Sequence, residues 1–150
     1  MKLEDTDITR RRFLLDSSKF IMGINICIIS LSGCASTKTY HGIMKNGNIS
    51  VDTRMFPELS EQAGGILIYA EGFPDPILLI NVDGSEFKAI SAVCTHQGCT
   101  LRLSKNFLRC PCHGSTFGIQ GNLVRGPAES SLKIFETNIV DGVVQITVNK

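Results

Sequence analysis

Apolar residues in this chain come in short runs rather than at helical spacing. Beyond Ile49 the runs with the length of a β-strand cover residues 66–69, 77–82, 87–93, 106–110, 132–135 and 143–148. No segment shows a long period of 3.6 residues, and the chain is rich in glycine. The pattern predicts an all-β domain.

Turn residues separate several of these runs. Asp83-Gly84 and Asp141-Gly142 lie between paired runs, and Asp-Gly supplies the positive backbone angles that a tight hairpin turn needs. Two β-hairpins are therefore predicted. Because proline lacks the N–H donor that a central strand needs, three prolines are predicted to lie in loops: Pro57, Pro74 and Pro76.

The first residues read as an export signal rather than as part of the fold. Residues 9–14 place paired arginines before an apolar stretch at 20–31, which resembles a twin-arginine signal. That stretch holds about a dozen residues, whereas a spanning helix needs about 20, so a retained anchor is the less favoured alternative. Residues 31–34 resemble a bacterial lipobox, which predicts lipidation at Cys34. An ordinary cleavage site or a chance cysteine remain alternatives.

Three segments are expected. Residues 1–34 form the export signal with its lipobox or membrane anchor, residues 35–48 a flexible tether rich in Ser, Thr, Lys and Gly, and residues 49–150 the folded domain. His41 is expected to be a solvated tether residue. The protein is expected to be exported and membrane-associated, on the periplasmic or extracytoplasmic face of a bacterium.

Size and charge narrow the possible functions. Roughly 115 residues remain to fold, few enough for a crosslink or metal site to matter. Residues 34–150 carry ten basic and ten acidic side chains, so no basic field is available to hold a phosphate backbone. Nucleic acid is therefore excluded as a partner.

Two motifs carry the candidate chemistry. Residues 94–99 read Cys-Thr-His-Gln-Gly-Cys, and residues 110–115 read Cys-Pro-Cys-His-Gly-Ser. Two Cys and two His could bind one zinc ion, but zinc would not explain the extra cysteine in each motif or the Gly-Ser that ends the second. A domain with two plain disulfides would leave both histidines unexplained.

The two motifs resemble those of Rieske proteins, specifically the disulfide-containing branch of quinol-oxidising cytochrome complexes. The resemblance implies a small Rieske fold of stacked antiparallel sheets, with two loops at one tip that bind a 2Fe-2S cluster. It also implies a Cys99–Cys112 disulfide. Imidazoles in place of two thiolates raise the potential to about −150 to +300 mV. The resemblance implies four metal ligands: Cys94, His96, Cys110 and His113.

Other positions match or depart from the family pattern. Ser115 corresponds to a serine that hydrogen-bonds a bridging sulfide, and Gly126-Pro127 resembles the proline loop that covers the cluster. Phe117 stands where many members carry a tyrosine that hydrogen-bonds a ligand thiolate, which predicts a lower potential. Gln97 replaces a leucine of the docking surface toward cytochrome b, so electron transfer is better supported than quinol oxidation.

The resemblance implies one-electron transfer by a membrane-associated subunit of a cytochrome bc/b6f-like complex, with cytochrome b and quinol as donor and a c-type cytochrome as acceptor. The chain would be an oxidoreductase subunit, not a complete catalytic unit. The alternatives are an arsenite-oxidase-like small subunit, a free lipid-tethered carrier or a zinc-binding structural lipoprotein. An oxygenase is excluded because only His41 would remain for its second iron.

Overall fold

The computed structural model describes residues 37–148, which form an all-β domain with two short 3-10 turns and no α-helix. Within these residues, no helical segment has the length and apolar character to cross a membrane. The elements in chain order are β1 (Lys38–Lys45), β2 (Asn48–Asp52), η2 (Thr53–Met55), η3 (Pro57–Ser60), β3 (Gly65–Glu71), β4 (Phe73–Asn81), β5 (Phe87–Ser91), β6 (Arg102–Ser104), β7 (Phe107–Arg109), β8 (Thr116–Gly118), β9 (Leu123–Arg125), β10 (Ile134–Val140) and β11 (Val143–Thr147).

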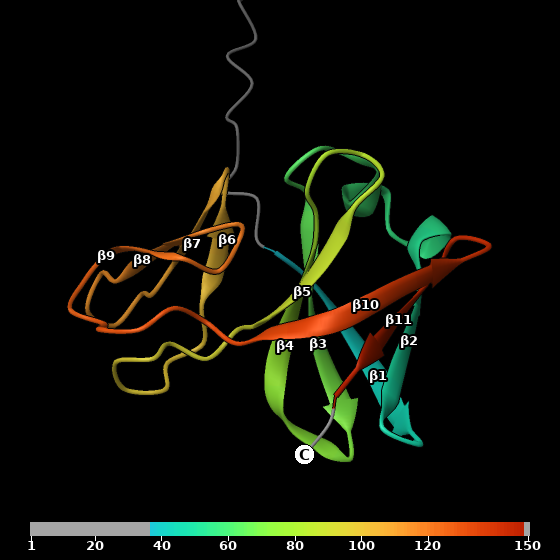
Figure 1. The fold of residues 1–150 in the computed structure, drawn as a ribbon, viewed down its shortest axis with the longest axis horizontal. Helices are drawn as coiled ribbons and strands as arrows, with labels where there is room; N and C mark the ends of the chain where they lie inside the picture. Colours follow the sequence, from blue (N-terminus) through green and yellow to red (C-terminus); the bar gives the residue numbers. More distant parts are fainter. Residues whose placement is uncertain (1–36, 149–150) are drawn as a thin grey trace, which may run out of the picture. The chain divides into compact units, whose positions relative to one another are not determined.

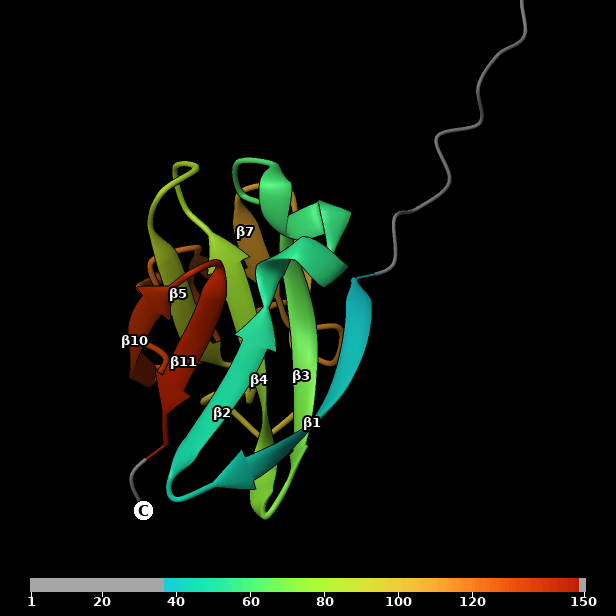
Figure 2. The ribbon, with the colours of Figure 1, turned by 90° about the vertical axis from the view of Figure 1, so that its right-hand side faces the viewer.

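The strands form two units (Figures 1 and 2). Seven of them close a barrel in the order β1-β2-β11-β10-β5-β4-β3. The β1–β3 pair is parallel, and the other barrel pairs are antiparallel. The other four form a small antiparallel sheet in the order β6-β7-β8-β9. This small sheet and its loops are inserted between β5 and β10. We call residues 92–132 the insert.

The apolar run in β4 is continuous because both faces of the strand are covered. Ile77 and Leu79 belong to the apolar core inside the barrel, whereas Leu78 and Ile80 belong to a second core. That second core also contains Leu108 from the insert. Since successive side chains of a strand point to opposite faces, β4 joins the two cores back to back and fixes the insert on the barrel.

Both predicted hairpins are present. Asp141-Gly142 is a two-residue turn between β10 and β11, with φ of 51° and 77°. The β4–β5 connection is longer, and Asp83 organises it. The N–H groups of Ser85 and Glu86 and the Ser85 hydroxyl donate hydrogen bonds to the Asp83 carboxylate and lower its pKa.

The predicted tether over residues 35–48 is wrong from residue 38 onward, because β1 occupies Lys38–Lys45 and pairs with both β3 and β2. Most of its side chains face solvent, so it lacks the apolar alternation that marks a strand, and its backbone pairing holds it in place. His41 stacks on Tyr69 with ring centroids 5.7 Å apart. Residues 1–34, including Cys34, lie outside the described part of the chain.

The predicted loop positions of two prolines are also wrong. Pro74 and Pro76 lie inside β4, while Pro57 opens η3. The register between β3 and β4 shifts between Ile68 and Ala70, and the paired positions of β4 jump from Phe73 to Ile77. Proline is tolerated at such an interruption because no ladder hydrogen bond is lost there.

A buried asparagine stabilises the end of the barrel that holds η3. The side chain of Asn81 is 2% exposed. Its Nδ2 donates to the Leu59 carbonyl at 2.8 Å, and its Oδ1 accepts the Gly84 N–H at 2.6 Å. Asn81→Leu would leave both backbone groups without these partners, which should lower the free energy of unfolding by about 2–3 kcal/mol in urea titrations of the cluster-loaded protein.

Asn138→Leu is the matched control. Asn138 is an exposed residue of β10, so its substitution should change the free energy of unfolding by no more than about 0.5 kcal/mol. Equal urea midpoints for the two variants would show that the Asn81 hydrogen bonds do not stabilise the fold.

Candidate metal centre

Two loops with the same backbone pattern carry the Cys/His motifs. The first follows β5 and begins at Cys94; the second connects β7 to β8 and begins at Cys110. The N–H of Cys94 donates to the Cys99 carbonyl, and the N–H of Cys110 donates to the Ser115 carbonyl, both at 2.9 Å. In the opposite direction, the N–H of the fourth residue after each cysteine donates to that cysteine's carbonyl, at 2.9 Å in the first loop and 3.1 Å in the second. These fourth residues are Gly98 and Gly114, whose φ of 75° and 77° favours glycine.

A disulfide joins the two loops. Cys99 and Cys112 are bonded, with their Cα atoms 6.5 Å apart, which confirms the disulfide expected from the family resemblance. The bond closes a segment with a sequence separation of 13 residues. A crosslink of this span contributes around 3 kcal/mol in the chain-entropy account. It also holds the two loops at a fixed separation.

The other two cysteines of the motifs are free and buried. Cys94 and Cys110 are 2% and 4% exposed. Burial raises the pKa of the Cys110 thiol, but hydrogen bonds from the His113 and Cys112 backbone N–H groups and from the Cys94 thiol outweigh it and lower that pKa overall. A thiolate is the form that binds a metal, so the loop favours the ligating state.

The two histidines of the motifs form a second pair. The ring centroids of His96 and His113 are 4.9 Å apart, with the ring planes at 88°. The Nδ1 atom of His96 is buried and has no hydrogen-bond partner within the described chain. A buried polar atom without a partner is costly, and a bond to a metal would remove that cost. His113 is exposed.

These donors fit a centre with two metal ions better than a single zinc. One tetrahedral zinc needs four donors within about 4 Å of one another. In residues 37–148 the only three donors gathered within 4.8 Å are the sulfurs of Cys99, Cys110 and Cys112. Two of those belong to the disulfide and cannot bind as thiolates. The pairs described above, two sulfurs and two imidazoles, match the donor set of a Rieske 2Fe-2S cluster.

Ser115 links the second loop to the segment that follows β9. Its hydroxyl is fully buried and accepts the Ala128 N–H at 3.0 Å, which leaves the hydroxyl proton available to donate. The first loop holds the same segment, since Thr95 Oγ1 donates to the Ser130 carbonyl at 2.8 Å. Gly126-Pro127 begins this segment and is exposed.

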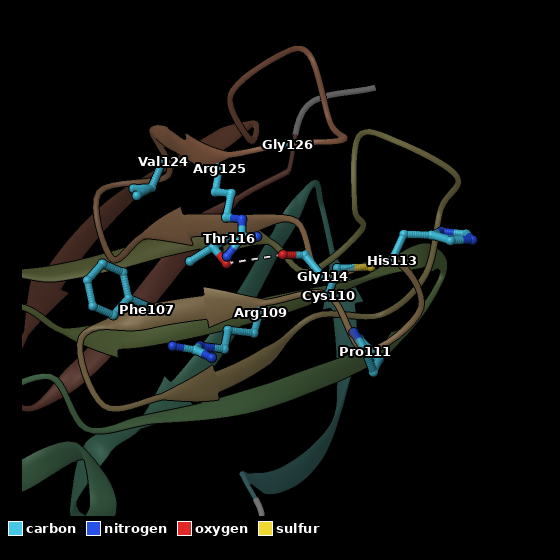
Figure 3. Close-up of a pocket in the computed structure, with 10 residues that line it drawn as sticks. All are labelled: Phe107, Arg109, Cys110, Pro111, His113, Gly114, Thr116, Val124, Arg125 and Gly126. Atoms are coloured by element: carbon cyan, nitrogen blue, oxygen red, sulfur yellow. Dashed lines mark hydrogen bonds between the residues drawn. The ribbon is translucent and has the colours of Figure 1, made fainter.

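A surface hollow of about 640 Å³ adjoins the second loop (Figure 3). Cys110 and His113 line one part of it, and the side chains of Arg109 and Arg125 lie farther along. The sequence interpretation did not single out these arginines. The signal that could have found them is the net positive charge of the insert, where acidic residues are scarce.

Phe117 is the family departure that shares a buried core with the two free cysteines. Its ring is fully buried in the apolar core that also contains Cys94 and Cys110. It offers no hydroxyl to a ligand sulfur. Gln97 is exposed on the first loop, where it adds a polar group to the tip.

Comparison with known proteins agrees with this donor set. The Rieske [2Fe-2S] domain family matches residues 58–136. The cytochrome b6-f complex iron-sulfur subunit of Nostoc punctiforme is 37% identical over 79 residues, which cover 51% of this chain and 44% of that protein. Cytochrome b6-f complex iron-sulfur subunit 2 of Synechocystis is 33% identical over 105 residues, 67% of this chain and 58% of that protein. The chain thus spans about half the length of these relatives.

Among solved structures, the apo form of the quaternary ammonium Rieske monooxygenase CntA is 26% identical, with a TM-score of 0.53. The match covers 61% of this chain and 30% of that one. It supports the fold described above.

Phe117→Tyr should raise the midpoint potential of the cluster-loaded protein. A hydroxyl placed in the buried core that contains Cys94 and Cys110, the cysteines expected to bind the cluster, would withdraw charge from them. A shift of about 40 mV is expected, equal to about 1 kcal/mol for a one-electron couple. Potentiometric titration monitored by electron paramagnetic resonance measures it.

Phe107→Tyr is the matched control, because Phe107 is 40% exposed on the same small sheet and its added hydroxyl would face water. Its midpoint should not change. Equal midpoints for Phe117→Tyr and the unsubstituted protein would contradict the role assigned to position 117.

Proposed function

The chain belongs to the Rieske [2Fe-2S] domain family, and we propose that it carries electrons as an exported, membrane-associated subunit of a quinol-oxidising cytochrome bc/b6f-like complex. Its cofactor is a Rieske-type 2Fe-2S cluster. The observation that supports this function best is the separation of the donors into a sulfur pair and an imidazole pair at one tip.

Cys94 and Cys110 would bind one iron, and His96 and His113 the other. When bound, the cluster supplies reversible one-electron chemistry at a potential within about −150 to +300 mV. The chain's own residues prepare the site for it. Backbone N–H groups stabilise negative charge on the Cys110 sulfur. The two loops, joined by the disulfide, bury Cys94 and Cys110 away from water.

Ser115 would stabilise the more negative, reduced state. Its oxygen is already used as acceptor for the Ala128 N–H, so its proton is the part left to donate. A hydrogen bond to a charged group is worth about 1.5–3 kcal/mol. Ser115 is thereby assigned the sulfide contact that the family resemblance implies.

His113 is the ligand candidate that a quinol would meet. It is exposed, whereas His96 is half-buried with Nδ1 turned inward. Curated relatives named as cytochrome b6-f complex iron-sulfur subunits support a place in such a complex. The attachment to the membrane is assigned to residues 1–34, through the twin-arginine signal and lipidation of Cys34 or through a retained anchor.

A second function is favoured by Gln97. This exposed polar side chain makes the first loop less suited to an apolar dock on cytochrome b. An electron-relay subunit of another exported oxidoreductase, similar to the arsenite oxidase small subunit, would not need that dock. A free lipid-tethered carrier would not need it either.

The cofactor and ligand assignment is tested on anaerobically reconstituted protein. It should hold two irons and two inorganic sulfides per chain and show a signal in electron paramagnetic resonance when reduced. His113→Ala should lose iron and that signal. His41→Ala, which removes an exposed histidine of β1, should keep both. Colourless, iron-free protein would refute the assignment.

The complex is tested by purification of the tagged full chain from detergent-solubilised membranes of its native host. A cytochrome b subunit and quinol–cytochrome c reductase activity should co-purify with it. Co-purification with a molybdenum-containing enzyme, without cytochrome b, would instead favour the relay function. Recovery of the chain alone would favour the free carrier.

A further inference from the structure

The insert and the barrel carry opposite charge. The insert has four basic residues and one acidic residue. The described barrel segments, residues 37–91 and 133–148, have five basic and nine acidic residues. The nearly balanced charge of residues 37–148 therefore hides a positive cluster-binding end and a negative barrel.

Three of the four basic residues of the insert form a row across the small sheet. Arg102 pairs with Arg109, Arg109 with Thr116, and Thr116 with Arg125. Directly paired residues of antiparallel strands point to the same face, so the arginine row occupies one face of the sheet. The opposite face carries the residues of the second apolar core, such as Leu108 and Phe117.

The arginine row makes no ion pair within the described part of the chain. The ion pairs there are Arg54–Asp52 and Lys88–Glu86, both in the barrel. All three arginines of the row are exposed. Like charges on neighbouring strands destabilise a sheet, so the fold itself gains nothing from this arrangement. An anionic partner bound to this face would neutralise the three arginines.

The row also borders the hollow beside the second loop. Figure 3 shows the side chains of Arg109 and Arg125 between His113 on one side and Phe107 and Val124 on the other. Phe107 and Val124 are 40% and 52% exposed. Arginine next to exposed aromatic and aliphatic side chains is typical of protein interfaces, whose centres are enriched in Arg and aromatic residues.

We propose that the arginine row, with Phe107 and Val124, is the docking surface for an acidic electron-acceptor protein. The acceptor would place a strip of carboxylates along the row and take one electron from the reduced cluster, with no bond made or broken. The identity of the partner as an acceptor rests on the proposed function, in which the donor is a quinol.

The shape of the row favours a protein over a single phosphate group. Neighbouring strands lie about 4.8 Å apart, so four strands spread the row over about 14 Å. One phosphate or carboxylate cannot meet charges spread over that length, whereas a line of acidic side chains can. The apolar contacts at Phe107 and Val124 would add to such an interface but would serve a free anion poorly.

The test is stopped-flow oxidation of the reduced, cluster-loaded full chain by a c-type cytochrome of strongly negative net charge. The double variant Arg102→Glu/Arg125→Glu should lower the second-order rate constant about tenfold at about 0.01 M ionic strength. The difference should vanish at high salt. Oxidation by a basic cytochrome c should not slow, and the midpoint potential should not change.

Lys38→Glu/Lys45→Glu makes the same change in net charge on exposed positions of β1 and should alter the rate constant less than about twofold. If the arginine double variant fails to fold, Arg102→Gln/Arg125→Gln replaces it, with Lys38→Gln/Lys45→Gln as control. Equal slowing in the arginine and lysine variants, or no slowing in either, would overturn the proposal.

Binding to vesicles of anionic phosphatidylglycerol separates a lipid role from a protein role. Loss of vesicle binding in the arginine double variant, with oxidation by the acidic cytochrome unchanged, would assign the row to the membrane and overturn the proposal. Because the kinetic assay uses the isolated chain, it can succeed even where no cytochrome b co-purifies. A failure of the proposed complex can therefore be told apart from a failure of the proposed docking surface.

Discussion

The hydrogen bonds that lower the pKa of the buried Cys110 thiol are the interaction on which the site depends. Burial alone would raise the pKa of this thiol, and a protonated thiol is a poor metal ligand. The Gly-containing turn of the second loop directs backbone N–H groups toward it. The disulfide from Cys99 to Cys112 then holds the other loop alongside. The fold thus supplies charge stabilisation before any metal binds.

Much of the barrel could be predicted because most of its strands have a recognisable local sequence pattern. Runs such as 77–82 and the Asp141-Gly142 turn combine an apolar pattern with a turn signal, and each corresponds to an observed strand or hairpin. Strand β1 was missed because its side chains are mostly exposed and polar. The Asn46-Gly47 turn that follows β1 was a usable hairpin signal. The Ser, Thr, Lys and Gly residues around it favoured a tether instead.

The chemistry of the site was predictable, whereas its surface was not. Each motif of the centre is contiguous, so spacing alone brings its Cys and His together. The arginine row is different, because Arg102 and Arg125 are neighbours only through the pairing of four strands. Register within a sheet is set by packing and turn geometry, which no short window of sequence contains.

Donor and acceptor would approach the same part of the molecule. The loop that carries His113 and the arginine row both border one hollow, so a protein seated on the row would also cover part of the tip. A quinol site formed at that tip would then be accessible only while the acceptor is absent. Weak, salt-sensitive docking suits such alternation, since a partner held by exposed charges can leave quickly. The strong contacts of the insert face inward, where Phe117 and Leu108 fix it to the barrel.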